Sequence, residues 1–243
     1  MRNPRVYQPQ SINVGQSLQL DDSGAHHIGK VLRMQAGQPL RLFNGEGGEY
    51  QATILAVDKK NVLVAVEQYL EDDRCSPLHT HLGQVISRGE RMDFALQKAV
   101  ELGVSEITPL FSMRSEVKLS GPRLDKRMQQ WQHLIISACE QCGLNRLPTL
   151  NPPQVALQWF ENSQASLKWL LHPGETPLKR LLGKDKPASV CLAIGPEGGF
   201  DDSEINAAKE AGFQAVAIGP RVFRTETAPT AALSLLQYQW GDF

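Results

Sequence analysis

The chain has 243 residues, of which 41% are hydrophobic and 21% are charged, and its formal net charge is −1. This length allows one large domain or a small domain beside a medium one, and the composition is typical of a globular protein. The near-neutral charge disfavours a globally basic nucleic-acid binder. Because no apolar run approaches membrane-span length and the N-terminus lacks a signal-peptide core, we expect a cytoplasmic protein without a membrane partner.

The first part of the chain, residues 1–70, has short alternating hydrophobic runs separated by turn-rich stretches. The runs cover residues 40–43, 50–57 and 62–66. This pattern predicts a small β-barrel or sandwich. Residues 71–77 break the pattern and form the expected linker.

From residue 78 to residue 243 the chain alternates between expected strands and expected helices. This alternation predicts a parallel α/β sheet. The last expected helix contains no charged residue, which predicts burial on several sides. The strands are expected at residues 81–87, 104–111, 167–171, 190–194 and 215–218, and the helices at 90–102, 124–142, 203–211 and 228–240.

The pair Cys139 and Cys142 has the spacing of a zinc or redox motif, but the sequence has no second pair of this kind. Both cysteines fall within an expected helix. Cys142 continues a helical stripe, so we interpret it as a core residue and expect no metal site. The other members of the stripe are Leu124, Met128, Trp131, Ile135 and Ala138.

Two loops that begin with Gly-Pro each follow an expected strand and precede an expected helix. They cover residues 195–199 and 219–227. Ligands bind at the carboxyl ends of strands in open parallel sheets, so both loops are expected at one crevice. Neither loop has a nucleotide-binding glycine motif, and Glu197 would repel a polyphosphate, which favours a small neutral or cationic cofactor. The alternative is that Gly and Pro only provide tight turns.

Both loops, together with four other blocks in the same order, resemble the bacterial RsmE-type methyltransferases of the SPOUT class. The blocks are residues 2–7, 26–33, 97–104 and 138–143. The resemblance implies methylation of N3 of uridine 1498 in 16S ribosomal RNA of the small ribosomal subunit, with S-adenosyl-L-methionine as cofactor. It further implies a homodimer, an α/β domain with a C-terminal trefoil knot, and a PUA-like N-terminal β-barrel.

The same resemblance implies that three strand-end loops hold the cofactor. Glycines in these loops let the backbone approach the adenosine closely, and backbone amides and carbonyls can then contact the adenine edge. The implied cofactor-binding residues are Leu171, His172, Gly195, Pro196, Glu197, Gly199, Ile218, Gly219, Val222, Phe223, Arg224, Thr225 and Thr227.

Methylation of uridine N3 requires that this nitrogen lose its proton. Arg224 is the candidate cation that stabilises the uridinate, and Glu197 and Glu226 are rival general bases. The alternative for Arg224 is a salt bridge with Glu226 that only shapes the loop.

Phosphate contacts are expected from basic residues, because the segments 1–41 and 114–146 each have a local charge of +3. RsmE-type enzymes usually have an arginine where this chain has Leu144, and Arg146 is the candidate replacement. Two other functions remain open: a non-catalytic RNA-binding or ribosome-assembly factor, and a SPOUT ribose 2′-O-methyltransferase. The predicted RNA contacts are Arg2, Arg5, Lys30, Arg33 and Arg146.

Overall fold

The computed structural model describes residues 3–243, so the predicted RNA contact Arg2 lies outside the described residues. The chain divides into two units. The first contains residues 1–75 and 136–147, and the second contains residues 76–135 and 148–243.

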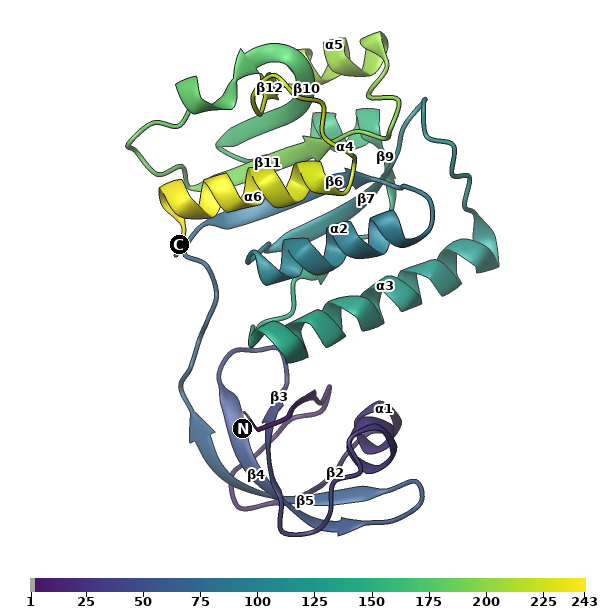
Figure 1. Ribbon diagram of the computed structural model, residues 1–243, viewed down its shortest axis with the longest axis vertical. Helices are drawn as coiled ribbons and strands as arrows, with labels where there is room; N and C mark the ends of the chain where they lie inside the picture. The colour runs from purple at the N-terminus through teal and green to yellow at the C-terminus, as the bar shows by residue number, and fades with distance from the viewer. Residues whose placement is uncertain (1–2) are drawn as a thin grey trace. The chain divides into compact units, whose positions relative to one another are not determined.

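The first unit is built on a five-stranded sheet with the strand order β1-β3-β4-β5-β2 (Figure 1). β1 pairs with β3 in parallel, and the other pairs are antiparallel. Alternate residues of the strands face one core, in which Leu40, Leu42 and Val64 are fully buried. The strands are β1 (Arg5–Tyr7), β2 (Ser17–Gln19), β3 (Pro39–Phe43), β4 (Glu49–Val57) and β5 (Val62–Leu70).

The three predicted strands of this unit correspond to β3, β4 and β5. The sequence analysis missed a helical turn, α1 (Asp22–His26), which continues into η1 (His27–Val31). The side chain of Asp21 caps α1 by accepting a hydrogen bond from the amide of Gly24 at 2.8 Å. Ile28 from η1 is fully buried in the core of the sheet.

The predicted domain boundaries require one correction, because residues 136–147 belong to the first unit rather than to the second. The physical reason is the guanidinium of Arg5 on β1. It donates hydrogen bonds to the carbonyl oxygens of Cys139 at 2.6 Å and Leu144 at 3.4 Å. It also bonds to the side chain of Asn145. These bonds join the end of α3 (Gly121–Cys142) to the first sheet.

The second unit contains a parallel sheet with the strand order β12-β10-β11-β6-β7-β8, and β9 also pairs with β7. The predicted α/β alternation is therefore confirmed. The strands are β6 (His79–Val85), β7 (Glu106–Phe111), β8 (Thr149–Leu150), β9 (Gln154–Val155), β10 (Leu167–Pro177), β11 (Ser189–Ile194) and β12 (Gln214–Ala217).

Helices cover both faces of this sheet. α4 (Ala156–Asn162) and α5 (Asp202–Glu210) pack on one face through an aromatic core that includes Phe160, Phe200 and Phe213. α2 (Glu90–Glu101) and α6 (Thr227–Trp240) lie side by side in front of the sheet in Figure 1.

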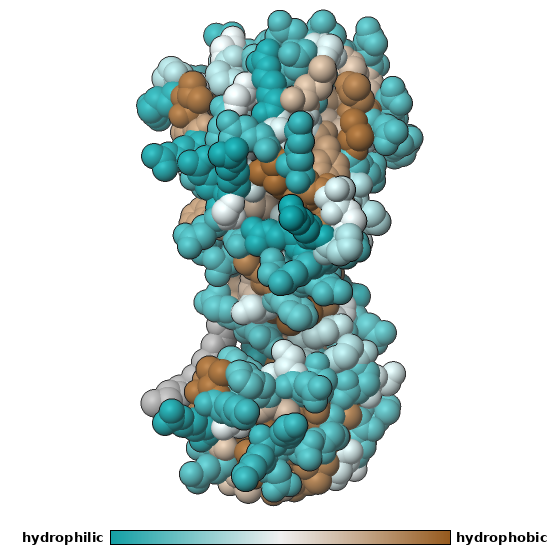
Figure 2. Space-filling view, turned by 90° about the vertical axis from the view of Figure 1, so that its right-hand side faces the viewer, coloured by the Kyte–Doolittle hydropathy of each residue, from teal (hydrophilic) through white to brown (hydrophobic). Residues whose placement is uncertain are grey.

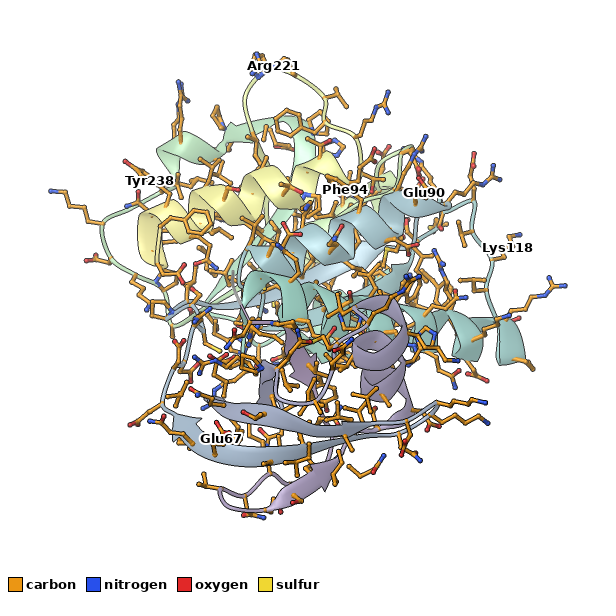
Figure 3. All side chains as sticks on the ribbon, turned by 60° about the horizontal axis from the view of Figure 1, so that its bottom comes forward. Glu67, Glu90, Phe94, Lys118, Arg221 and Tyr238 are labelled. Carbon is orange, nitrogen blue, oxygen red and sulfur yellow. The ribbon has the colours of Figure 1, made fainter. Side chains whose placement is uncertain are left out.

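The uncharged helix α6 is buried on one face only. Leu233, Leu236 and Trp240 are buried, whereas the side of the helix that carries Tyr238 faces outward, with this residue 74% exposed (Figure 3). Within the chain, this face of α6 is therefore not covered.

On α3, Cys139 is fully buried and Cys142 is half-buried. Burial raises the pKa of the Cys139 thiol well above its usual range. Residues 3–243 contain no group of three or more His, Cys, Asp or Glu residues that could hold a metal ion. In the same part of the chain, no helix is long and apolar enough to span a lipid bilayer.

Candidate active site

The middle of β10 and the carboxyl ends of β11 and β12 surround a cavity of about 280 Å³. Three chain segments line most of it. The segment 171–173 was predicted to be a loop after a strand, but it lies within β10, where the pairing register with β12 shifts after Leu171. The lining residues are Leu171, His172, Pro173, Ile194, Gly195, Pro196, Glu197, Gly198, Gly199, Val216, Ala217, Ile218, Gly219, Arg221, Val222, Phe223, Thr225 and Ala228.

Eleven of the thirteen residues predicted to bind a cofactor line this cavity, and Arg224 and Thr227 do not. Most of the residues that the prediction missed lie at the ends of the strands or within the same loops. Arg221 is one of them, and Figure 3 shows it at the tip of its loop.

The loop after β11 is a tight turn in which the amide of Gly199 donates to the carbonyl of Pro196 at 2.9 Å. Gly199 has a φ of 69°, a left-handed conformation that favours glycine. At Gly195 a Cβ atom would lie 3.2 Å from the ring of Phe200. The backbone of the turn therefore favours glycine at 199, and a side chain at 195 would crowd the ring of Phe200.

A buried hydrogen-bond chain joins two of the loops to β6. Gln84, which is fully buried at the end of β6, donates its side-chain amide to the hydroxyl of Thr225 at 3.1 Å. Thr225 in turn donates to the carbonyl oxygen of Gly195 at 2.8 Å. The sequence analysis missed Gln84, because its partner lies 141 residues away.

Comparison with known proteins identifies the family. A family model described as an RNA methyltransferase domain matches residues 74–237, and one described as an RNA methyltransferase PUA domain matches residues 20–67. The ribosomal RNA small subunit methyltransferase E of Buchnera aphidicola subsp. Acyrthosiphon pisum (strain APS) is 35% identical, over 99% of this chain and 95% of its own. The chain belongs to the RsmE-type ribosomal RNA methyltransferases.

Solved structures agree with this assignment. A methyltransferase from Legionella pneumophila, determined with the bound cofactor SAM, is 46% identical with a TM-score of 0.97, and the match covers 100% of both chains. The RsmE protein from Neisseria gonorrhoeae, bound to S-adenosyl methionine, is 37% identical with a TM-score of 0.92 and the same coverage.

Glu197 lines the cavity of this RsmE-type chain, but its carboxylate forms an ion pair with Arg91 of α2. Both side chains are partly exposed, at 42% and 47%. The sequence analysis did not predict this partner.

Glu226 and Arg224 differ in their surroundings. Glu226 immediately precedes α6, and its Oε2 atom is buried without a hydrogen-bond partner among the described residues. Arg224 is exposed. The ion pairs of residues 3–243 do not include one between Arg224 and Glu226, so the structure does not contain the predicted alternative salt bridge.

The prediction that Arg5 contacts RNA is wrong. Its side chain is 4% exposed and forms a 3.0 Å ion pair with Glu49. Burial lowers the pKa of Arg5, and the bond to Glu49 opposes this effect. Together with its bonds to backbone carbonyls, this pairing makes Arg5 part of the interior of the first unit.

The other predicted RNA contacts of the first unit are accessible. Lys30 and Arg33 are exposed near the end of η1, and Arg33 has a φ of 53°, which is unusual outside glycine. Arg146 is 53% exposed and forms a 2.9 Å ion pair with Asp73. Leu144 is only 7% exposed.

Proposed function

We propose that this chain transfers the methyl group of S-adenosyl-L-methionine to N3 of uridine 1498 in 16S ribosomal RNA. The observation that carries the proposal is the cavity between the middle of β10 and the ends of β11 and β12, which is lined by eleven of the predicted cofactor residues. Two relatives with matching folds were solved with this cofactor bound. The small-subunit RNA substrate is supported by the names of the curated relatives.

In this proposal the loops at residues 195–199 and 218–223 hold the adenosine through backbone groups. The cofactor supplies an electrophilic methyl group on a cationic sulfonium, so the carboxylate of Glu197 at the cavity is compatible with it. We further propose that the C-terminal part of the second unit, which forms the cavity, has the trefoil knot of the SPOUT class. The first unit is then the PUA-like barrel.

The methyl transfer forms a bond between N3 and the methyl carbon as the bond from sulfur to that carbon breaks. The electron pair of the broken bond stays on sulfur, and the N3 proton leaves to a base. Arg224 stabilises the negative charge that develops on the uracil, because it is exposed beside the cavity-lining residues Phe223 and Thr225. Glu226 is the favoured base, since Glu197 is already paired with Arg91.

We also propose that the protein is a homodimer that uses the outward face of α6. Tyr238 on α6 is 74% exposed and Phe94 on the adjacent α2 is 44% exposed. Exposed aromatic residues of this kind are enriched in protein interfaces. Because its proposed substrate is the small ribosomal subunit, the enzyme would act in the cytoplasm.

The deciding experiment is a methylation assay with labelled cofactor and small ribosomal subunits that lack this modification. We expect 3-methyluridine at position 1498 after nuclease digestion and chromatography. A 2′-O-methylated nucleoside would instead support the ribose methyltransferase, and cofactor-free RNA binding without turnover would support the non-catalytic factor.

A calorimetric titration complements the assay. The cavity loops contain no phosphate-binding motif, so we expect binding of S-adenosylmethionine and S-adenosylhomocysteine but not of ATP or nicotinamide dinucleotides. Tight binding of ATP without a response to either methionine-derived ligand would contradict the proposal.

A further inference from the structure

A second cleft, with a volume of about 470 Å³, adjoins the cofactor cavity. Glu197 and Gly198 line both of them, so the loop after β11 forms a shared wall. The cleft is otherwise dominated by Arg88, Arg91 and Arg114. We call these three residues the arginine cluster.

The arginine cluster comes from two neighbouring strand ends of one sheet. Arg88 lies in the loop between β6 and α2, Arg91 lies in the first turn of α2, and Arg114 follows β7. Their side chains remain 69%, 47% and 46% exposed. Figure 2 views the molecule from the side to which the carboxyl ends of these strands point, and much of the surface there is hydrophilic.

Each guanidinium of the cluster already has one carboxylate partner. Arg88 pairs with Glu116 at 3.1 Å, Arg91 pairs with Glu197, and Arg114 pairs with Asp201 at 3.2 Å. A guanidinium has five N–H donors, so these contacts leave donors that face the solvent. The ion pairs therefore hold the arginines in position without using all of their hydrogen-bonding capacity.

The loop that carries Arg114 is held in place by a buried carboxylate. Glu204 on α5 is 1% exposed and accepts hydrogen bonds from the hydroxyl of Ser112 at 2.9 Å and the amide of Met113 at 3.0 Å. Arg114 itself donates to the carbonyl oxygen of Gly198 at 3.3 Å. The cleft is thus connected to the cofactor loop by direct bonds.

Further basic residues extend from this region. Arg127 on α3 donates to the carbonyl oxygen of Gly89 at 3.2 Å, and Gly89 lines the cleft. Figure 3 shows the basic Lys118 extending outward from the loop that follows Arg114. It also shows the acidic Glu90 at the start of α2. The lining side chains alone, three arginines and two glutamates, have a formal charge of +1, and Asp201, the partner of Arg114, lies outside the lining.

We propose that the arginine cluster binds backbone phosphates of the RNA that flank the target uridine. The inference rests on the proposed function. To reach the cofactor methyl group, the target uracil must unstack from the neighbouring nucleobases, while the phosphates on either side of its nucleotide stay within one nucleotide of the cavity. The cluster provides the cations next to that cavity, and arginine suits phosphate because its donors form a planar fork. Phosphate contacts of this kind fix the register of the substrate.

The test compares the variant Arg88→Ala and the double variant Arg88→Ala/Arg91→Ala with the wild type. Small ribosomal subunits are the substrate, and KM, kcat and cofactor affinity are measured over a series of salt concentrations. The matched control is Lys209→Ala, which also removes a partly exposed ion pair, with Glu175 at 3.3 Å, outside the cleft.

We expect the double variant to raise KM for the ribosomal substrate about tenfold at low salt. The single variant Arg88→Ala, which leaves the pair between Arg91 and Glu197 intact, should raise KM less and keep near-native cofactor affinity. The slope of log KM against the logarithm of the salt concentration should decrease by about 0.7 for each phosphate contact to single-stranded RNA that is lost. The Lys209→Ala variant should match the wild type. If the double variant is unstable, the single variant Arg88→Glu replaces it, because this side chain is largely exposed.

The outcomes separate this inference from the proposed function. A wild-type protein that binds the cofactor but does not methylate the ribosomal RNA overturns the proposed function itself. An active wild type whose cluster variants keep native KM and native salt dependence overturns only the phosphate site. Loss of cofactor affinity in parallel with the rise in KM also overturns it, because the arginines would then act on the cofactor.

Discussion

The hydroxyl of Thr225 donates a 2.8 Å hydrogen bond to the carbonyl oxygen of Gly195, and this bond joins two of the three loops around the cavity. Thr225 is only 4% exposed, and it also accepts a hydrogen bond from Gln84. The shape of the cavity therefore depends on one buried hydroxyl.

Replacement of Thr225 by valine keeps the volume but removes this hydroxyl. It leaves the carbonyl of Gly195 and one N–H group of the Gln84 amide without a partner, which costs about 1–3 kcal/mol of stability. We expect cofactor affinity to fall about tenfold, equivalent to ~1.4 kcal/mol. Calorimetry checks this, with Thr230→Val on α6 as the control, because the Thr230 hydroxyl donates to the backbone carbonyl of Glu226, the residue directly before the helix, and does not join two loops. Equal affinities of the two variants would contradict the prediction.

Removal of the charge of Arg224 should slow methyl transfer more than it weakens cofactor binding. The loss of one preorganised group at a developing anion costs about a hundredfold to a thousandfold in rate. Single-turnover assays of Arg224→Ala on small subunits measure this. A near-native rate with collapsed cofactor affinity would place Arg224 in the cofactor site instead.

The general base can be identified by a pH series of Glu226→Gln and Glu197→Gln. A variant without its base should have a rate that climbs with pH, because uridine then deprotonates unaided. We expect this behaviour for Glu226→Gln and a flatter profile for Glu197→Gln, whose carboxylate pairs with Arg91. Identical profiles would mean that neither carboxylate takes the proton.

Replacement of the exposed Tyr238 by glutamate should convert the proposed dimer to a monomer. A carboxylate buried in an apolar contact has no partner to offset the loss of its hydration. Sedimentation of the wild type and of Tyr238→Glu measures the assembly state. Leu55→Glu is the control, because Leu55 is 46% exposed on β4 of the first unit. A wild type that sediments as a monomer would refute the proposed interface.

The buried Arg5 should be essential for the stability of the first unit. Arg5→Met leaves Glu49 without its closest cation and removes the guanidinium donor from the carbonyl oxygens of Cys139 and Leu144. Breaking a buried ion pair costs about 3–5 kcal/mol of unfolding free energy. The control Arg74→Met breaks an exposed pair with Asp72 and should cost about 1 kcal/mol or less. Urea unfolding measures both, and similar losses would contradict the prediction.

His81 should make the stability of the second unit depend on pH. Its Nε2 accepts a hydrogen bond from the indole of Trp159 at 3.3 Å, and burial lowers the pKa of His81 below its usual value near 6.5. The unfolded chain therefore binds the proton more readily, and stability is lost as pH falls below about 6.5. We expect His81→Gln to weaken this fall between pH 7 and 5.5. The control is His133→Gln, because His133 is exposed. This substitution should leave the pH dependence of stability unchanged.

The sequence by itself determined most strands and helices of the second unit and the two Gly-Pro loops of its cavity, but not β8, β9, α4 or the length of β10. Apolar periodicity reports which side of a segment faces a core, and this is a local property of the chain. Gly and Pro after β11 and β12 likewise report turns that only these residues adopt easily. For this reason β11, α5 and the loop at Gly195 could be predicted within one or two residues.

Only the tertiary structure decided which polar side chains meet. Arg5 and Cys139 are 134 residues apart, and Arg91 and Glu197 are 106 apart. In sequence Arg5 resembles any exposed basic residue of the N-terminal segment. Its burial follows from the packing of β1 against the end of α3, and the pairing of Glu197 follows from the meeting of two strand ends. Such contacts are set by how distant elements pack, because burial and pairing are properties of the assembled fold and not of the neighbouring residues.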